Sequence, residues 1–380
     1  MENKVKNSKN LLGIDASRSN VAQRTGTEYY SYEIIKAIVE NDDFKYRLYS
    51  RTPIEYLKVT GNIQSKVMSF PRLWSQFRLS CEILRNPPDV LFIPAHTIPL
   101  YHGRCVVTTL HDVGFRHFPE LYTPLERYYH DFCMRFAVKH ATRIIAISEA
   151  TKKDIIKFYN AKADKIRVIY HGYTKEKYYP LKKGETASQG VEALKPFIFF
   201  IGRIEAKKNV KNLIKAYGLL RKDPLIKHKL VLAGRPGYQY EEIKSEVENL
   251  EDEIKKDVVE LGYVEDDTVS ELTRHASVFA FPSRFEGFGM PIIETMASGV
   301  PVVASNTSSI PEIASGAALL SDPGDIKNLS HNLFLAIKDI KTRNDLTQKG
   351  LRRASEFSWE KSARQTLEVI REAYKQAYSA

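Results

Sequence analysis

The sequence contains few cysteines and none of the long apolar runs that mark membrane proteins. Cys81, Cys105 and Cys133 are odd in number and form no CxxC pair, which argues against a disulfide framework and against a structural zinc site. No apolar run approaches the roughly 18 residues that cross a bilayer. The basic first ten residues precede a strand-like segment where a signal peptide would have its apolar core. These absences predict a cytoplasmic protein.

Several catalytic patterns are missing as well. The sequence has no Asp-x-Asp, the pair of carboxylates that often clamps a nucleotide diphosphate through a metal ion. It has no Walker loop, and Gly287 and Gly289 are not followed by the third glycine of a dinucleotide-binding fingerprint. We therefore expect no bound metal and no cofactor.

Positive charge is concentrated in the first half of the chain. The 380 residues carry a formal net charge of +11, and residues 1–180 hold 28 Lys and Arg against 18 Asp and Glu, a balance of +10. Such asymmetry suits an anionic partner, either a membrane surface, a phosphorylated lipid or a nucleic acid. A surface that is simply soluble and rich in lysine fits the same balance.

Short β-branched runs alternate with amphipathic stretches along the chain. In the first half the predicted strands are residues 11–14, 46–50, 89–93, 105–110, 143–147 and 166–169, and the predicted helices are residues 28–40, 124–139 and 149–159. In the second half the predicted strands are residues 197–201, 229–233, 258–261, 278–281 and 300–304, and the predicted helices are residues 210–220, 238–250, 291–297, 325–338 and 359–378. This alternation is typical of parallel sheets covered on both faces.

The pattern predicts an α/β protein with two doubly wound, Rossmann-like domains. Residues 1–175 form the first domain, the Lys-rich passage 176–195 a linker, and residues 196–358 the second domain. Residues 359–380 are expected to form a helix that packs back on the first domain. Because such folds bind ligands at the carboxyl ends of their strands, we expect the site in a cleft between the two sheets.

The most informative segment is FPSRFEGFGMPIIE, residues 281–294. An apolar strand ends at its start, and a helix is predicted to begin near Met290 with a proline in its first turn. Free backbone N–H groups at such a helix start can hold a phosphate. Glu286 and Glu294 flank this position, which suits a ligand with sugar hydroxyls on one side and a ribose diol on the other. A solvated N-capping loop is the alternative.

A second segment, FIFFIGRIEAKKN at residues 197–209, places two cations at the end of a buried strand. Arg203 offers a planar fork and Lys208 a point charge, and together they can neutralise a leaving diphosphate. Two ordinary surface cations would give the same pattern. The proposed phosphate site in the first segment favours the functional interpretation.

These segments, together with GVPVV at residues 299–303, resemble retaining glycosyltransferase family 4, and most closely its bacterial mannosyltransferases of surface polysaccharide synthesis. TGT at residues 25–27, TLHD at residues 109–112 and FSW at residues 357–359 extend the resemblance over most of the chain. The family has the GT-B architecture. The resemblance therefore implies a metal-independent hexosyltransferase with its donor bound mainly to the second domain.

The resemblance also implies residue roles. Arg203 and Lys208 would bind the donor diphosphate, Glu294 the ribose and Glu286 the transferred sugar, while His111 would lie next to that sugar. As catalytic residues it implies His111, Arg203, Lys208 and Glu286. The residues implied to bind the donor are Gly26, Thr27, Gly202, Arg203, Lys208, Tyr263, Val264, Glu286, Gly287, Phe288, Gly289, Met290 and Glu294. Thr25 stands where many relatives carry a second glycine.

The implied reaction is retaining transfer from GDP-mannose to a hydroxyl of a glycan or lipid-linked glycan acceptor. A UDP-linked glucose, galactose or N-acetylglucosamine donor is the first alternative, and a GT-B-fold UDP-sugar 2-epimerase is the second. A nucleic-acid-binding module is disfavoured because the basic residues are dispersed over the predicted helices. They form no basic strand with aromatic residues between them.

Residues 66–85 are also predicted to form a basic amphipathic helix. The segment contains a single acid, Glu82, and its apolar residues recur at helical spacing. Its basic residues are Lys66, Arg72, Arg78 and Arg85. Such a helix could lie on anionic lipid at the inner face of the membrane, or its apolar stripe could pack on the sheet of the first domain.

Overall fold

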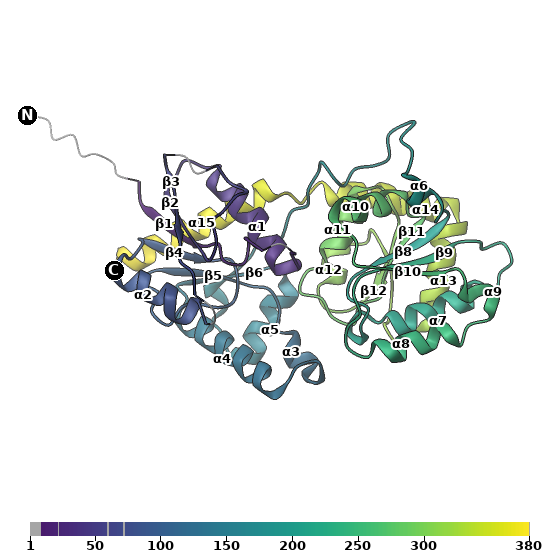
Figure 1. The fold of residues 1–380 in the computed structure, drawn as a ribbon, viewed down its shortest axis with the longest axis horizontal. Coiled ribbons are helices and arrows are strands. Elements are labelled where there is room, and N and C mark those ends of the chain that lie inside the picture. Colours follow the sequence, from purple (N-terminus) through teal and green to yellow (C-terminus); the bar gives the residue numbers. More distant parts are fainter. Residues whose placement is uncertain (1–8, 22, 59–60, 71–72, 380) are drawn as a thin grey trace, which may run out of the picture. The chain divides into compact units, whose positions relative to one another are not determined.

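The computed structural model of the chain describes residues 9–21, 23–58, 61–70 and 73–379, and it contains two compact units (Figure 1). Unit 1 consists of Met1–Gly172 and Trp359–Ala380, and unit 2 of Tyr173–Ser358. Among the described residues, no helix combines the length and the apolar composition of a bilayer span.

Unit 1 is built on a parallel sheet of seven strands in the order β3-β2-β1-β4-β5-β6-β7. Its strands are β1 (Leu11–Asp15), β2 (Lys45–Ser50), β3 (Ile63–Val67), β4 (Val90–Ile93), β5 (Val106–Leu110), β6 (Arg143–Ala146) and β7 (Ile166–Val168). Its helices are α1 (Gly26–Val39), η1 (Ser75–Leu79), α2 (Ser80–Arg85), α3 (Gly114–His117), η2 (Pro119–Leu121), α4 (Pro124–His140), α5 (Glu149–Tyr159), η3 (Ala163–Lys165) and α15 (Trp359–Tyr378).

The core of unit 1 uses both ends of the chain. Strands β4 and β5 are buried along their whole length, because a parallel sheet is covered on both faces. Helix α15 contacts α1 and the strands β4, β5 and β6, and buries Trp359, Leu367 and Ile370 there. Full burial of each such side chain contributes about 1.5–3 kcal/mol. The C-terminal helix is therefore an integral part of unit 1.

Unit 2 repeats the architecture with six parallel strands in the order β10-β9-β8-β11-β12-β13. Its strands are β8 (Phe197–Ile201), β9 (Lys229–Ala233), β10 (Val258–Gly262), β11 (Val278–Phe281), β12 (Val302–Ser305) and β13 (Leu319–Ser321). Its helices are α6 (Gln189–Glu192), η4 (Ala206–Lys208), α7 (Val210–Leu220), α8 (Tyr240–Glu248), α9 (Asp252–Lys255), α10 (Asp266–His275), α11 (Met290–Ala297), α12 (Ile310–Ala314), α13 (Ile326–Lys338) and α14 (Ile340–Ala354).

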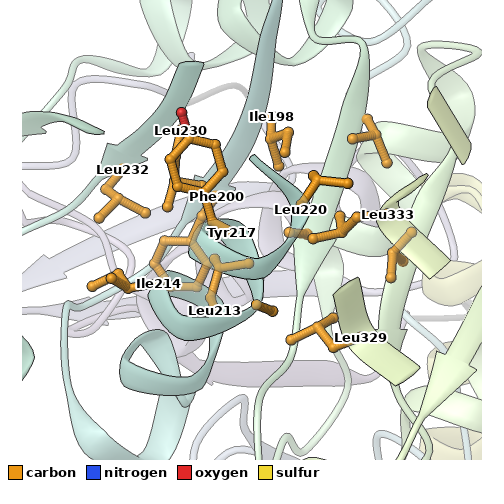
Figure 2. Packing of buried hydrophobic residues seen from close by; sticks show 14 of the residues in the cluster. Ile198, Phe200, Leu213, Ile214, Tyr217, Leu220, Leu230, Leu232, Leu329 and Leu333 are labelled. Carbon is orange, nitrogen blue, oxygen red and sulfur yellow. The ribbon is translucent and has the colours of Figure 1, made fainter. Parts of the chain in front are cut away.

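One face of the second sheet packs against α7 and α13. Phe200 of β8 and Leu230 of β9 meet Tyr217 and Leu213 of α7, and Leu333 of α13 closes the cluster (Figure 2). The Tyr217 hydroxyl reaches the edge of this core and donates to the backbone oxygen of His228 at 2.9 Å. The apolar residues of α7 thus pack that helix against β8 and β9.

The strand order reverses between β1 and β4 in unit 1 and between β8 and β11 in unit 2. In doubly wound sheets, the loops at the carboxyl ends of the strands on either side of such a reversal separate and leave room for a ligand. In unit 2 these are residues 202–209 after β8 and residues 282–289 after β11. The two segments singled out in the sequence therefore flank the reversal of unit 2.

The prediction of one amphipathic helix over residues 66–85 is wrong. Lys66 lies in β3, which pairs with β2, and helical structure begins only at Ser75. Leu73 has a φ of 53°, which no right-handed helix allows. Arg72 lies outside the described residues. From Trp74 onward the segment packs partly on the sheet, since Trp74 is fully buried whereas Phe77 is 51% exposed.

Residues 176–195, expected as a linker, belong to unit 2 and contact it at several points. The backbone N–H and hydroxyl of Ser188 both donate to Glu271. Arg274 donates to the backbone oxygen of Lys177 at 2.6 Å and lies over the ring of Tyr179. These contacts attach the passage to α10.

Candidate active site

The loop after β8 carries two cations on either side of a buried carboxylate. Gly202, with a φ of 149°, turns the chain as the strand ends. Arg203 follows with an exposed side chain, and its Nε lies 3.6 Å from Oε2 of Glu205, a residue that is only 8% exposed. Lys208 ends the short helix η4, and Asn209, in the left-handed region, leads into α7.

The loop after β11 supplies the partner of Lys208. Nζ of Lys208 donates to Oε1 of Glu286 at 2.6 Å, and both side chains are more than four-fifths buried. The ammonium group also lies 5.8 Å from the ring centroid of Phe281, the last residue of β11. This ion pair joins the two loops across the reversal of strand order.

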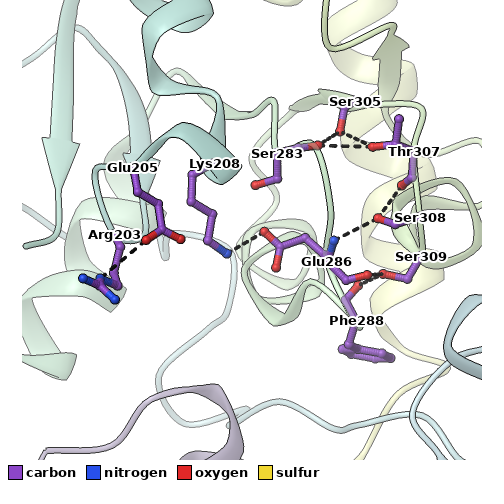
Figure 3. A network of polar contacts seen from close by, with 10 residues as sticks. All are labelled: Arg203, Glu205, Lys208, Ser283, Glu286, Phe288, Ser305, Thr307, Ser308 and Ser309. Atoms are coloured by element: carbon purple, nitrogen blue, oxygen red, sulfur yellow. Dashed lines mark hydrogen bonds and ion pairs between the residues drawn. The ribbon is translucent and has the colours of Figure 1, made fainter. Parts of the chain in front are cut away.

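Hydroxyl groups at the end of β12 and in the loop that leads to α12 hold the Glu286 loop in place (Figure 3). The backbone N–H of Glu286 donates to Oγ of Ser308 at 2.9 Å. Oγ of Ser309 donates to the backbone oxygens of Glu286 and Phe288 at 3.0 and 2.9 Å. Ser305 and Thr307 both donate to the backbone oxygen of Ser283. The conformation of the loop is therefore fixed by a neighbouring element before any ligand binds.

Helix α11 begins immediately after this loop. Gly289 has a φ of 96°, in the left-handed region that favours glycine, and Met290 is the first helical residue. Pro291 occupies the first turn, as its position in the sequence predicted. Glu294 is half-buried and lies one turn further along the helix. The helix start and both glutamates of the E-x7-E segment thus belong to one continuous stretch of backbone.

Tyr263 and Val264 follow β10, two strands away from β8 in the sheet. The side chain of Tyr263 is 44% exposed. The guanidinium carbon of Arg235, which follows β9, lies 4.7 Å from the centroid of the Tyr263 ring. Arg235 was not among the residues singled out in the sequence.

In unit 1, the segment TGT at residues 25–27 forms the start of α1. Thr25 is the N-cap in an extended conformation, and a capping box joins it to Glu28. Gly26 is the first helical residue and Thr27 follows it in the first turn. Thr25 therefore fits where relatives carry a second glycine, because an N-cap needs no left-handed backbone.

His111 follows β5 and is 8% exposed. Its Nε2 lies 2.9 Å from the backbone oxygen of Pro94. Burial lowers the pKa of the imidazole below 6.5, and the bond to Pro94 only partly opposes this shift. In the neutral ring Nε2 carries the proton, and Nδ1 is left as an acceptor. Tyr30 packs edge-on against the ring, with centroids 4.9 Å apart.

The structure gathers Arg203, Lys208 and Glu286 with the start of α11 in unit 2, and it places His111 and the 25–27 segment in unit 1. Sequence reasoning missed the pairing of Arg203 with Glu205 and the supporting hydroxyl groups. Glu205 lies in the segment GRIEAKKN, which the sequence analysis singled out. The burial of the Glu205 side chain, however, depends on the neighbouring loop after β9. Among the described residues, no group of three or more His, Cys, Asp and Glu side chains is gathered as a metal site.

The fold defines a two-unit α/β protein of GT-B type. Its candidate site has two cations, Arg203 and Lys208, near the start of a helix at the strand reversal of unit 2. Residues 184–353 match the family model described as Glycosyl transferases group 1, and residues 25–177 match Glycosyltransferase Family 4. The chain belongs to the family 4 glycosyltransferases and is a hexosyltransferase.

Similar proteins include bacterial enzymes of O-antigen assembly. The chain is 33% identical over 293 residues to the O-antigen chain mannosyltransferase B of Escherichia coli, covering 72% of this chain and 74% of that protein. It is 26% identical over 345 residues to the O-antigen chain mannosyltransferase RfbU of Salmonella typhimurium, covering 84% of this chain and 88% of that protein.

Solved structures share the fold at low sequence identity. The sucrose-phosphate synthase of Thermosynechococcus elongatus gives a TM-score of 0.75 at 16% identity, over 97% of this chain and all of that one. HepE of Anabaena, solved in complex with UDP-glucose, gives a TM-score of 0.72 at 19% identity, over 96% of this chain and all of that one. These likenesses confirm the expected GT-B fold.

Proposed function

We propose that this enzyme transfers mannose from GDP-mannose to a hydroxyl of a glycan or lipid-linked glycan acceptor, with retention of the anomeric configuration and without a metal ion. The observation that carries the proposal is the Lys208–Glu286 ion pair across the strand reversal of unit 2. A cation beside a carboxylate suits a ligand that carries both a diphosphate and sugar hydroxyls, and this supports the proposal. The names of two similar bacterial proteins, both mannosyltransferases, favour mannose.

In the proposed site, each cation is balanced by a carboxylate until the donor arrives. Arg203 lies against Glu205, and Lys208 against Glu286. A diphosphate would compete for both cations, and Glu286 would then be released to accept hydrogen bonds from the transferred sugar. Glu294 would hold the ribose, and the backbone from Gly287 to Met290 would line the phosphates. Gly26, Thr27, Gly202, Tyr263 and Val264 complete the proposed donor-binding set.

The proposed chemistry is attack on the same face as the leaving group. The acceptor oxygen forms a bond to the anomeric carbon as the bond from that carbon to the β-phosphate oxygen breaks. The electron pair stays on the diphosphate, which takes the acceptor's proton. Arg203 and Lys208 would oppose the negative charge that grows on the leaving group. The neutral His111, with Nδ1 as an acceptor, would orient a hydroxyl of the transferred sugar.

A UDP-sugar donor is the second candidate, because the structurally similar HepE was solved with UDP-glucose. Release of free GDP from GDP-mannose, or of UDP from a UDP-sugar, should be measured with and without a glycan acceptor. Transfer from GDP-mannose that depends on the acceptor supports the proposal. Transfer from a UDP-sugar alone would replace it with the second candidate. A change in the donor sugar without any glycosylated product would indicate a 2-epimerase instead.

We further propose peripheral contact of unit 1 with anionic membrane. Phe77, Cys81 and Leu84 form an exposed row on η1 and α2, with Arg78 and Arg85 beside it. Each cation near an anionic surface contributes about 1 kcal/mol and is screened by salt. Co-sedimentation with anionic vesicles should therefore be lost in high salt and weakened by Phe77→Ser together with Arg78→Glu. Absence of binding at every salt concentration would refute this contact.

A further inference from the structure

Unit 1 contains an open hollow between the helices that follow strand β5. Helix α3 and the turn η2 form one wall with Phe115, Arg116 and Pro119. The N-terminal half of α4, which lies near α3 in unit 1 (Figure 1), forms the other wall. The hollow has a volume of about 410 Å³, and sites for small molecules have volumes in this range.

One face of α4 supplies the second wall. Pro124, Tyr128 and Asp131 are three or four residues apart, a spacing that places side chains on the same side of a helix. Arg127 precedes Tyr128 and lines the hollow as well. The side chain of Tyr128 is 73% exposed, so its ring is open to solvent and not part of the core.

Polar contacts fix the two walls relative to each other. Arg116 of α3 forms an ion pair with Oδ1 of Asp131 on α4. The hydroxyl of Tyr159 on α5 donates to the same oxygen at 3.0 Å. Nε of Arg135 donates to the other carboxylate oxygen, Oδ2, at 2.8 Å. The hollow is therefore formed before any ligand binds, and its one carboxylate is already engaged by three donors.

Arg127 differs from the other two charged residues of the hollow. Its side chain is exposed and makes no hydrogen bond or ion pair with any residue that the structure describes. The neighbouring acid, Glu126, is engaged elsewhere, because its Oε2 accepts from the backbone N–H and the hydroxyl of Thr123 at 2.8 and 2.9 Å. The lining therefore holds one positive charge that no carboxylate compensates, and it suits a negatively charged ligand.

The hollow lies close in sequence to the residue that the proposed function puts beside the transferred sugar. Phe115 follows His111 by four residues, and four residues of fully extended chain span at most about 14 Å. A glycan acceptor extends away from the hydroxyl that reacts. Further sugars of the same acceptor therefore come within range of the hollow.

We propose that this hollow binds an acidic sugar of the acceptor, away from the sugar that receives the new residue. The inference rests on the proposed function in that the acceptor is taken to be a glycan. Tyr128 offers the negative face of its ring to the C–H groups of a pyranose. Arg127 binds the carboxylate or phosphate of that sugar through its planar fork. A uronic acid in the glycan, or the phosphate that joins a glycan to a lipid, would supply the negative group.

Ligand-observed NMR on the full chain tests this site with glucuronate, glucose 1-phosphate and neutral methyl glucoside. GDP is present throughout, so that the proposed donor cations are occupied. At least one of the two anions should bind, and methyl glucoside should bind at least about tenfold more weakly, because it lacks the charged acceptor. Tighter binding of glucuronate supports the site with a uronic acid as the source, and tighter binding of glucose 1-phosphate supports it with a phosphate.

Variants of α4 locate the binding. Arg127→Ala should weaken the anion by at least about tenfold, and Arg127→Lys should restore only part of the loss, because it keeps the charge without the fork. Tyr128→Ala should also weaken the anion, whereas Tyr128→Phe keeps the ring and should bind as the wild type does. Arg364→Ala removes an exposed arginine from α15 of the same unit and is the matched control that should change nothing.

The failures of this inference and of the proposed function are distinguishable. Absence of binding by both anions, equal binding of all three sugars, or anion binding that Arg127→Ala leaves unchanged overturns the acidic-sugar site. The donor site is then untouched, because Arg127 is not among the proposed donor contacts, and GDP should bind equally to the wild type and to Arg127→Ala. Wild-type protein that binds an anion through Arg127 but does not bind GDP refutes the proposed donor and supports the hollow as a sugar site.

Discussion

Lys208 and Glu286 form the central contact of the candidate site, and their burial gives each a large effect on the other. Both side chains are more than four-fifths buried, and they are 2.6 Å apart. Removing one partner leaves an uncompensated charge in a poorly solvated place. A loss of activity on substitution therefore has to be separated from a loss of folding.

Lys208→Ala is expected to lower kcat by about 10²–10³ with a smaller change in the donor's KM. In the proposed role, the charge of Lys208 would oppose the charge that develops on the leaving diphosphate, and loss of one preorganised group costs about 2.7–4 kcal/mol in the transition state. Steady-state kinetics measure this effect. Lys207→Ala, one residue earlier in η4, is the matched control and should keep near-normal kcat. A normal kcat in Lys208→Ala would refute the diphosphate role.

The buried environment of His111 predicts how kcat should depend on pH. Burial lowers its pKa below 6.5, so the neutral ring persists as the pH falls through 6.5. If Nδ1 must accept a sugar hydroxyl, kcat should stay constant from pH 8 to 6.5 and decline only at lower pH. His111→Ala should lose about 1 kcal/mol of hydrogen bonding, roughly a fivefold fall in kcat, and should lack this acid limb. The exposed His331 on α13 provides the control, since His331→Ala should leave the pH profile unchanged.

At the level of elements, three glycines allow the ends of β8, β9 and β10 to converge. Gly202 follows β8, Gly234 follows β9, and Gly262 is the last residue of β10, and all three have positive φ. The N–H of Gly202 donates to the oxygen of Ala233 at 3.0 Å, and that of Gly234 to the oxygen of Gly262 at 2.7 Å. A Cβ on Gly234 would stand 1.8 Å from the backbone oxygen of Gly202. No side chain can be accommodated there without moving the Arg203 loop.

Gly234→Ala should therefore destabilise unit 2 by roughly 2–6 kcal/mol, as backbone strain and overpacking add. Gly190→Ala is the control, because a Cβ at Gly190 in α6 would meet nothing within 4 Å. That variant should change stability by no more than about 1 kcal/mol. Urea unfolding followed by far-UV circular dichroism compares the two variants. Equal stability of both would contradict the observed packing of the strand ends.

The elements differ in how well the sequence predicted them. Strand β8, FIFFI, and helix α7 are confirmed residue for residue, because a buried apolar run and a regular helical stripe are strong signals. Strand β3, IQSKV, was missed because only Ile63 is buried at that sheet edge. Helix α14 was missed because it buries only three of its residues.

The candidate site was predictable only in part, for a related reason. Arg203, Lys208 and the E-x7-E glutamates stand out because they follow apolar strands or begin helices. The pairing of Glu205, and the support from Ser308 and Ser309, depend on which loops become neighbours in the sheet. Strand order decides this, and no single segment of the sequence encodes it.

At the scale of the whole molecule, the two units can be followed separately. Both tryptophans, Trp74 and Trp359, belong to unit 1, so their fluorescence reports on that unit alone. Most proposed donor contacts belong to unit 2. A nucleotide present at about 100 times its Kd stabilises the state that binds it by about 2.7 kcal/mol.

GDP should therefore raise the thermal midpoint seen by far-UV circular dichroism more than the midpoint seen by tryptophan fluorescence. EDTA should change neither the GDP effect nor turnover, because the proposed counter-charges are Arg203 and Lys208. Strict dependence of turnover on Mg²⁺ or Mn²⁺ would refute the metal-independent proposal. A GDP effect confined to the fluorescence transition would move the principal donor contacts to unit 1.

Unit 1 takes its residues from both ends of the chain, whereas unit 2 is one uninterrupted segment. On the ribosome, unit 2 is therefore complete before α15 has been made. Until then, the sheet of unit 1 lacks the helix that covers it. The surface that contacts Trp359, Leu367 and Ile370 stays exposed. Domains usually mature in the order in which they leave the ribosome. Here the second unit can finish folding first, and the first unit is the part that keeps apolar surface exposed until α15 has been made.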